Sequence, residues 1–168
     1  MAIAPGDKAP LFTLMDHNRK NVSLEKFLGR KNEILVFFVF AFTDGWTSQI
    51  LELRKAQSEF SRRDTQVLGI SCDSTATLAA YNLSFGPSLG YPVQLLSDFY
   101  PHGDVTKKYK LFNSEIGTAD RSAVVIDKSG YVRQVNKYQF RSVLGPNGYG
   151  IVDLDFNVKD LISFIEDL

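Results

Sequence analysis

The sequence predicts an α/β fold in which a central mixed sheet lies between helices. First, nine consecutive apolar residues at 34–42 form the kind of run found in a strand that is buried on both faces. Second, segments with strand patterns alternate along the chain with segments of helical spacing. Third, the short polar segment 127–130 separates two strand patterns and is typical of an antiparallel connection.

The first half of the chain alternates between strand and helix patterns. Phe12 and Leu14 alternate with polar neighbours before a turn at 16–18, which predicts an N-terminal β-hairpin. The segment from Thr47 to about Arg63 has apolar residues at helical spacing, and its C-terminal end carries cationic residues, which the helix dipole favours there. This pattern predicts a helix. The elements expected after the hairpin are a short helix at Ser23–Leu28, the buried strand at Glu33–Phe40, a helix from Thr47 to about Arg63, and a second buried strand at Gln66–Ser71.

The second half continues this alternation. Asp73 or Ser74 is expected to cap a helix that Gly86 and Pro87 then interrupt, and Asn157 is expected to cap the last helix. That last helix carries one apolar stripe: Val158, Leu161, Ile162, Ile165 and Leu168. The other expected elements are a helix at Thr75–Leu83, a strand at Val93–Leu96, a helix at Asp104–Tyr109, a loop at Leu111–Ala119, a strand pair at Arg121–Ile126 and Tyr131–Val135, and an exposed turn at Gly145–Gly150.

Length and charge narrow the possible functions. With 168 residues, 44% of them hydrophobic, the chain fits one domain with a sizeable core. Nineteen Lys and Arg residues balance nineteen Asp and Glu residues, so no net field favours nucleic acid or an anionic membrane. The apolar run is too short to span a bilayer, and the first residues lack a signal-peptide pattern. We therefore expect a cytoplasmic protein that binds neither nucleic acid nor membrane.

Cysteine and histidine usage argues against a metal site. The single cysteine, Cys72, excludes an internal disulfide framework, and His17 and His102 lie too far apart for metal-ligand spacing. We expect no metal and no other cofactor. Cys72 precedes a helix start, where a thiolate is favoured, but the adjacent Asp73 opposes its ionisation. His102 has no nucleophile beside it in the sequence and is expected to support a turn.

Several blocks of sequence resemble peroxiredoxins of the alkyl hydroperoxide reductase / thiol-specific antioxidant family, in the same order and over most of the chain. These blocks are GDKAPLFTL, VSLEKFLGRKNEILVFF, AFT at 41–43, GISCDS at 69–74, PVQLLSDFYPHGDVTKKYKLFN and RSAVVIDKSGYVR. The phrase LLSDFYPHG and its spacing to Arg121 are most similar to the one-cysteine bacterial subgroup called AhpE. The resemblance implies a thioredoxin-like fold over residues 1–168, whereas the pattern alone also allows a flavodoxin-like sheet.

The departures from the family's pattern gather at its active site. The family has a proline, three residues, a threonine, two residues and then the peroxide-attacking cysteine, commonly followed three residues later by a glutamate. In this chain the proline position holds Val39, the threonine is Thr43, the cysteine position holds Trp46, and the glutamate position holds Gln49. Arg121 matches the family's active-site arginine.

The chemistry of peroxide reduction needs a thiolate, because the anion is the nucleophile that attacks the O–O bond. An indole offers one N–H donor and no comparable nucleophile. We therefore expect no intact catalytic residue at this site, and a protein that serves as a binding, regulatory or assembly module. The alternative enzyme hypothesis makes Cys72 a relocated nucleophile, assisted by Arg121 or Thr43.

Each remaining site residue has a structural and a functional interpretation. Trp46 is either an aromatic plug or a platform for a small ligand. Arg121 either forms a structural ion pair or carbonyl cap or binds an anion, and Thr43 is expected to cap the next helix. Cys72 is either a small half-buried core residue or a redox thiol.

Partners are implied by the resemblance alone. Members of the family commonly dimerise through loops beside the active site, which implies a homodimer with an interface at Phe42 to Trp46 and Phe99 to His102. A third hypothesis makes the chain a heterodimer partner of an active peroxiredoxin.

Overall fold

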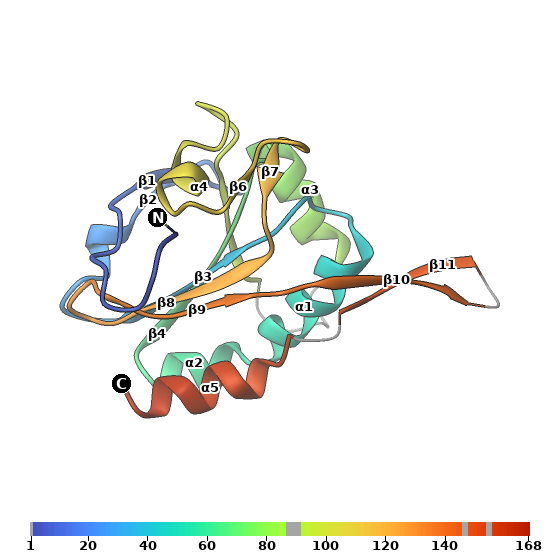
Figure 1. The fold of residues 1–168 in the computed structure, drawn as a ribbon. Coiled ribbons are helices and arrows are strands. Elements are labelled where there is room, and N and C mark those ends of the chain that lie inside the picture. The colour runs from blue at the N-terminus through green and yellow to red at the C-terminus, as the bar shows by residue number, and fades with distance from the viewer. Residues whose placement is uncertain (1, 87–91, 146–147, 154–155) are drawn as a thin grey trace.

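The computed structural model describes residues 2–86, 92–145, 148–153 and 156–168. Its centre is a seven-stranded mixed sheet with the strand order β2-β1-β5-β4-β3-β8-β9 (Figure 1). These strands are β1 (Thr13–Asp16), β2 (Asn21–Ser23), β3 (Asn32–Phe37), β4 (Thr65–Ser71), β5 (Gln94–Ser97), β8 (Ser122–Ile126) and β9 (Val132–Lys137). The helices are the 3-10 turn η1 (Leu24–Lys26), α1 (Asp44–Lys55), α2 (Gln57–Arg62), α3 (Thr75–Ser84), α4 (Asp104–Lys108) and α5 (Val158–Glu166).

The predicted buried strand lies in the middle of this sheet. All six residues of β3 are buried, as the unbroken apolar run predicted for a strand covered on both faces. β3 runs parallel to β4 and antiparallel to β8, with Ile34 opposite Val67 on one side and Val125 on the other. β4 is also parallel to β5, so the C-terminal ends of β3 and β4 meet at one edge of the sheet.

Two hydrophobic clusters fill the two faces of the sheet. On one face, Ile34 and Val36 of β3 and Phe38, which directly follows β3, pack with residues of α1, α2, α3 and α5. On the other face, Leu35 and Phe37 pack with the N-terminal strands, η1 and α4. Figure 1 shows α2 and α5 together below the sheet and α4 on the opposite side with β1 and β2. The period-two alternation of a strand explains this division.

The long predicted helix is two helices. It was expected from Thr47 to about Arg63, whereas α1 begins at Asp44 and α2 ends at Arg62, with a break at Ala56. Alanine favours helices, so the sequence carries no local signal for this break. Phe60 of α2 is nonetheless fully buried in the first cluster, together with Leu53 and Ala56.

Two predicted irregular segments contain strands. The expected loop at Leu111–Ala119 holds the small antiparallel pair β6 (Phe112–Asn113) and β7 (Thr118–Ala119). The expected turn at Gly145–Gly150 falls within the hairpin of β10 (Phe140–Gly145) and β11 (Gly148–Asp153), and its residues 146–147 lie outside the described residues. This hairpin extends away from the body of the protein (Figure 1).

The predicted N-terminal hairpin, helix caps and final helix are present, but one residue of the predicted apolar stripe differs from its prediction. The N-terminal hairpin is present as β1 and β2, and Ser74 rather than Asp73 caps α3 by accepting a hydrogen bond from the Thr77 N–H. Asn157 caps α5, as predicted, and Leu161 and Ile165 are buried. Leu168, predicted to continue that stripe, is exposed because α5 ends at Glu166.

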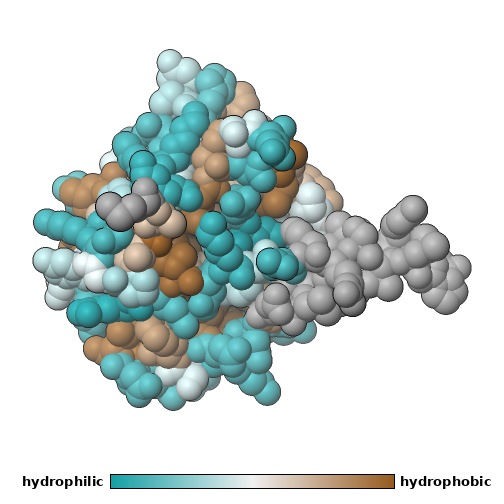
Figure 2. Space-filling view, in the orientation of Figure 1, coloured by the Kyte–Doolittle hydropathy of each residue, from teal (hydrophilic) through white to brown (hydrophobic). Residues whose placement is uncertain are grey.

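The surface shows no single apolar face in the view of Figure 2, where hydrophobic residues form separate patches among hydrophilic ones. Among the described helices, none has the length and apolar character needed to cross a membrane.

A buried carboxyl group lies at the start of the central strand. Glu33 is fully buried, and neither of its carboxyl oxygens has a hydrogen-bond partner among the described residues. Burial, together with the nearby negative charge of Asp127, raises the pKa of Glu33 to about 8. Burial, and then the charge of Glu33, raise the pKa of Tyr109, whose hydroxyl donates to the Pro10 carbonyl at 2.9 Å.

This carboxyl group makes the stability of the fold depend on pH. The unfolded Glu33 carboxyl ionises near pH 4.5 and the folded one near pH 8, so the folded state binds one more proton between these values. Stability therefore falls as the pH rises through this window, by an amount on the order of a few kcal/mol. We expect Glu33→Gln to remove this fall. Urea unfolding of both proteins at pH 6 and pH 9 measures it; equal pH dependence in the two proteins would contradict the prediction.

Candidate functional site

Trp46 stands in the first turn of the helix that follows the central strand. α1 begins at Asp44 with Thr43 in the N-cap position, so Trp46 is the third helical residue. Its indole is fully buried and stacks on the ring of Phe38, with 4.0 Å between ring centroids and 2° between ring planes. No face of the ring is open to a small ligand. This geometry agrees with an aromatic plug and not with a ligand platform.

The indole also crowds the neighbouring strand β4. A Cβ atom added at Gly69 would lie 3.6 Å from Cζ2 of Trp46, 3.4 Å from the Phe38 ring and 2.6 Å from Cδ2 of Leu95. Only glycine fits between these side chains. The Nε1 of Trp46 is buried and has no hydrogen-bond partner within the described ranges, which costs free energy that the stacking and burial offset.

A chain of hydroxyl groups runs from the loop after β3 to α3. The Thr43 hydroxyl donates to the Phe40 carbonyl at 2.8 Å and makes no capping hydrogen bond, so the predicted capping role of Thr43 is wrong. The Thr47 hydroxyl lies 2.9 Å from the Thr43 carbonyl oxygen and 3.1 Å from the Tyr81 hydroxyl. Tyr81 was not predicted as a site residue, because Thr47, the partner of its hydroxyl, lies more than thirty positions away in the sequence.

Tyr81 and Arg121 are both buried and lie within electrostatic reach of each other. Burial raises the pKa of Tyr81 to about 12, while the Thr47 hydrogen bond and the positive charge of Arg121 act in the opposite direction. The phenol therefore stays protonated at neutral pH. Phe42 covers this tyrosine edge-on at 4.9 Å between centroids and adopts a left-handed backbone with φ 63°.

Arg121 lies beside a pocket of about 520 Å³ at the start of β8. Val39, Ile116 and Ala119 give this pocket an apolar wall, while Asp120, Arg121 and Lys137 bring charge to it. The Val39 carbonyl accepts a hydrogen bond from the Thr118 hydroxyl, which joins the end of the β3 segment to β7. Gln49 of α1 is buried as well. The structure thus holds Arg121 and Gln49 inside the protein rather than at a mobile surface.

Cys72 lies at the same sheet edge but in a different environment. It directly follows β4, is half-buried, and its Sγ would lie 3.4 Å from a Cβ atom at Gly103, next to α4. Burial raises the pKa of the Cys72 thiol to about 11, and the negative charges of Asp98 and Asp73 act in the same direction. The cation that acts on this thiol is Lys107, not Arg121.

Asp73 links the loop after β3 to the ends of β4 and β5, a role that the sequence did not predict. One carboxylate oxygen accepts from the Ala41 N–H at 2.8 Å and from the Ser71 hydroxyl at 2.8 Å. The Asp73 carbonyl accepts from the Ser97 hydroxyl at 2.6 Å. These bonds fix the loop that carries Phe42 and Thr43 onto the ends of β4 and β5.

The two histidines occupy unrelated places. Nδ1 of His17 accepts from the Leu95 N–H at 3.2 Å, and His102 lies in a turn in which its N–H donates to the Phe99 carbonyl at 2.9 Å. The turn role predicted for His102 is therefore correct. Over the described residues, no group of three or more His, Cys, Asp or Glu side chains is arranged to hold a metal ion.

Comparison with known proteins agrees with the fold and with the sequence resemblance. The chain is 39% identical over 128 residues to alkyl hydroperoxide reductase E of Mycobacterium tuberculosis, covering 76% of this chain and 81% of that protein. The structure of Plasmodium vivax 2-Cys peroxiredoxin matches with a TM-score of 0.77 and 26% identity over 97% of this chain and 94% of the other. Peroxidoxin BcpB of M. tuberculosis shares the fold, with a TM-score of 0.78 and 22% identity over 99% and 98% of the two chains.

The thioredoxin-like fold of peroxiredoxins is thereby shown for this chain, and the flavodoxin-like alternative is excluded. Residues 5–135 match the AhpC/TSA family. With this match and a relative at 39% identity, the chain belongs to the AhpC/TSA family of peroxiredoxins.

Proposed function

We propose that this protein is a peroxiredoxin without thiol peroxidase activity, which acts as a binding or regulatory module. The observation that carries the proposal is the buried Trp46 indole in the first turn of α1, at the position that the sequence resemblance assigns to the attacking cysteine. An indole supplies no thiolate, and its volume fills the space in which a peroxide would meet one. Arg121 and Thr43 remain, without a nucleophile beside them.

The environment of Cys72 supports the same proposal. A thiol with a pKa of about 11 is a thiolate in only about one molecule in 10⁴ at pH 7. Besides burial, the negative charges of Asp98 and Asp73 contribute to this raised pKa, and the arginine that would orient a peroxide acts on Tyr81 instead. The alternative in which Cys72 is a relocated nucleophile lacks the electropositive surroundings that such chemistry needs.

The proposal includes a cytoplasmic homodimer formed by a single-domain chain. Within the expected interface, Phe42, Phe99 and Tyr100 are 57%, 52% and 76% exposed, and large exposed apolar side chains mark contact surfaces. Trp46, which the sequence reading also placed there, is fully buried and cannot contact a partner. The same exposed side chains would serve a heterodimer with an active peroxiredoxin, and co-purification from the native source distinguishes the two assemblies.

Peroxide consumption tests the proposal directly. We expect purified protein with dithiothreitol to remove hydrogen peroxide no faster than Cys72→Ser, because the remaining thiol is protonated and shielded. The measurement is the first-order decay of peroxide at pH 7. A decay well above that of the Cys72→Ser control would overturn the proposal.

Replacement of Trp46 tests whether the absence of a cysteine at position 46 causes the proposed lack of thiol peroxidase activity. We expect Trp46→Cys and Trp46→Ser each to lose about 3–5 kcal/mol of stability, because a fully buried ring stacked on Phe38 is removed. Only the cysteine variant should gain peroxide consumption. Urea unfolding gives the stability and the peroxide assay gives the activity. If both variants stay inactive while folded, the changes at Val39 and Gln49 also silence the site.

Alkylation separates the second hypothesis from the first. We expect Cys72 to react slowly with iodoacetamide at pH 7 in the native protein and fast after denaturation, because its pKa is raised in the folded state. Mass spectrometry over time measures the modified fraction. Native and denatured rates of similar size would favour Cys72 as a reactive thiol.

A further inference from the structure

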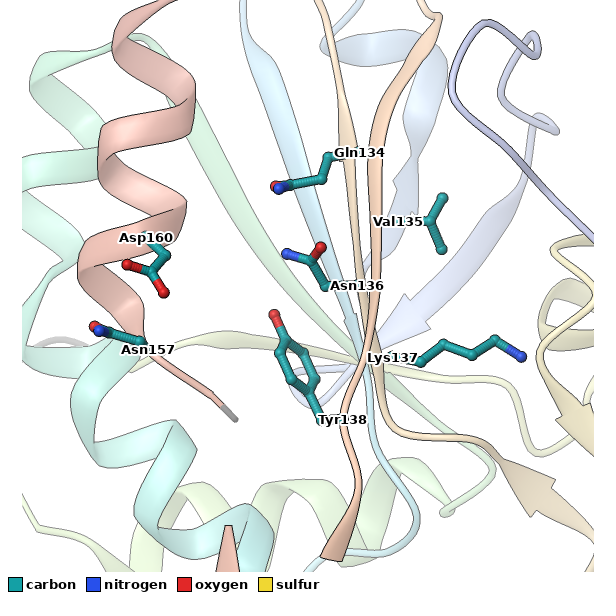
Figure 3. Close-up of a pocket in the computed structure, with 7 residues that line it drawn as sticks. All are labelled: Gln134, Val135, Asn136, Lys137, Tyr138, Asn157 and Asp160. Atoms are coloured by element: carbon teal, nitrogen blue, oxygen red, sulfur yellow. The ribbon is translucent and has the colours of Figure 1, made fainter. Parts of the chain in front are cut away.

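A second pocket, of about 420 Å³, lies between β9 and the first turn of α5 (Figure 3). This volume falls within the range of about 300–1,000 Å³ typical of small-molecule sites. The residues that line it are Gln134, Val135, Asn136, Lys137, Tyr138, Asn157 and Asp160. It shares Lys137 and Tyr138 with the pocket beside Arg121, and its other lining residues are different.

Polar side chains from β9 and from the start of α5 line this pocket. Figure 3 shows Gln134, Asn136 and Tyr138 extending from β9 toward α5, where Asn157 and Asp160 lie. The side chains of Val135 and Lys137 extend from the opposite side of β9. Alternate residues of a strand share a face, which explains why the three polar side chains of β9 extend to the same side.

The chemistry of the lining favours a neutral ligand with several hydroxyl groups. Three carboxamides, one carboxylate and one phenol line the pocket, and Lys137, the one cation among its described lining residues, points away. An anion would therefore meet the Asp160 carboxylate without a compensating charge. A hydroxyl group both donates and accepts, and so matches carboxamides and carboxylates in turn.

One buried atom in this set lacks a partner. Oε1 of Gln134 is buried and accepts no hydrogen bond from the described residues. A buried acceptor without a donor costs free energy, which a ligand hydroxyl at this point would recover. The side-chain carbonyl oxygen of Asn157 already accepts from the Lys159 N–H at 2.9 Å, so it is not an open acceptor like that of Gln134.

We propose that this pocket binds a small neutral polyhydroxylated molecule, such as a monosaccharide or a cyclic polyol. The Gln134 side-chain carbonyl oxygen and the Asp160 carboxylate accept from ligand hydroxyls, and the amide group of Asn136 donates to them. The Tyr138 ring, held edge-on against Phe156 at 5.3 Å between centroids, supplies the apolar wall.

Titration of the 168-residue protein with glucose, galactose and myo-inositol tests this proposal, with amide chemical shifts as the readout. We expect at least one of them to give saturable shifts confined to β9 and the start of α5. Gln134→Met should weaken binding about tenfold through the loss of one hydrogen bond. This variant should fold at least as well as the parent, because it removes a buried acceptor without a partner among the described residues. Asp160→Asn should weaken binding several-fold.

Asp167→Asn is the matched control, since Asp167 lies exposed at the other end of the same helix. It should leave the affinity unchanged. The proposal is overturned if none of the three probes shifts these residues, or if Gln134→Met binds as tightly as the parent protein. Guanidinium or choline binding at Asp160 without polyol binding would also overturn it and would identify a cation site.

Discussion

The parallel stack of Trp46 on Phe38 joins the end of the central strand to the start of α1, and the rest of the site is arranged around it. Both rings are fully buried, and two large aromatic side chains in contact contribute much of the core energy in any small domain. The stack sets where α1 begins and thus where Thr43, Thr47 and Gln49 stand. Asp73 then holds the connecting loop against β4, so the loop has little freedom to open.

This packing separates the two groups that thiol chemistry would need together. Burial raises the pKa of the Tyr81 phenol, and the positive charge of Arg121 acts against this rise. The thiol of Cys72, the single cysteine, lies beside α4, where burial and the carboxylates of Asp98 and Asp73 raise its pKa. A cation next to a thiol would favour the thiolate, and carboxylates do the reverse. The peroxiredoxin fold is therefore retained in this chain, while its electrostatic pattern favours a protonated thiol.

Much of the fold could be predicted from the sequence because its signals are local or strongly periodic. The run at 34–42 identified the central strand, and Ser74 and Asn157 carried recognisable caps. The break at Ala56 left no signal in the sequence, because alanine favours a helix. The hairpin of β10 and β11 was missed because its glycine-rich tip by itself predicts only a turn.

Only the site residues that match the family's sequence pattern could be predicted. The place of Trp46 followed from the resemblance, but its burial did not. The contact of Tyr81 with Thr47 and that of Asp73 with Ala41 were not predicted, since each joins residues more than thirty positions apart. The polar lining of the β9 pocket could not be predicted from the sequence either, because its residues come together only when α5 packs beside β9.

The crowding around Gly69 limits how this protein can adapt to a smaller residue at position 46. A Cβ atom at Gly69 would lie 2.6 Å from Cδ2 of Leu95, so a larger residue there requires the Leu95 side chain to move. Gly69 therefore cannot be enlarged to fill a void left by the indole unless Leu95 shifts as well. A smaller residue at position 46 would thus leave one face of the Phe38 ring without its stacking partner.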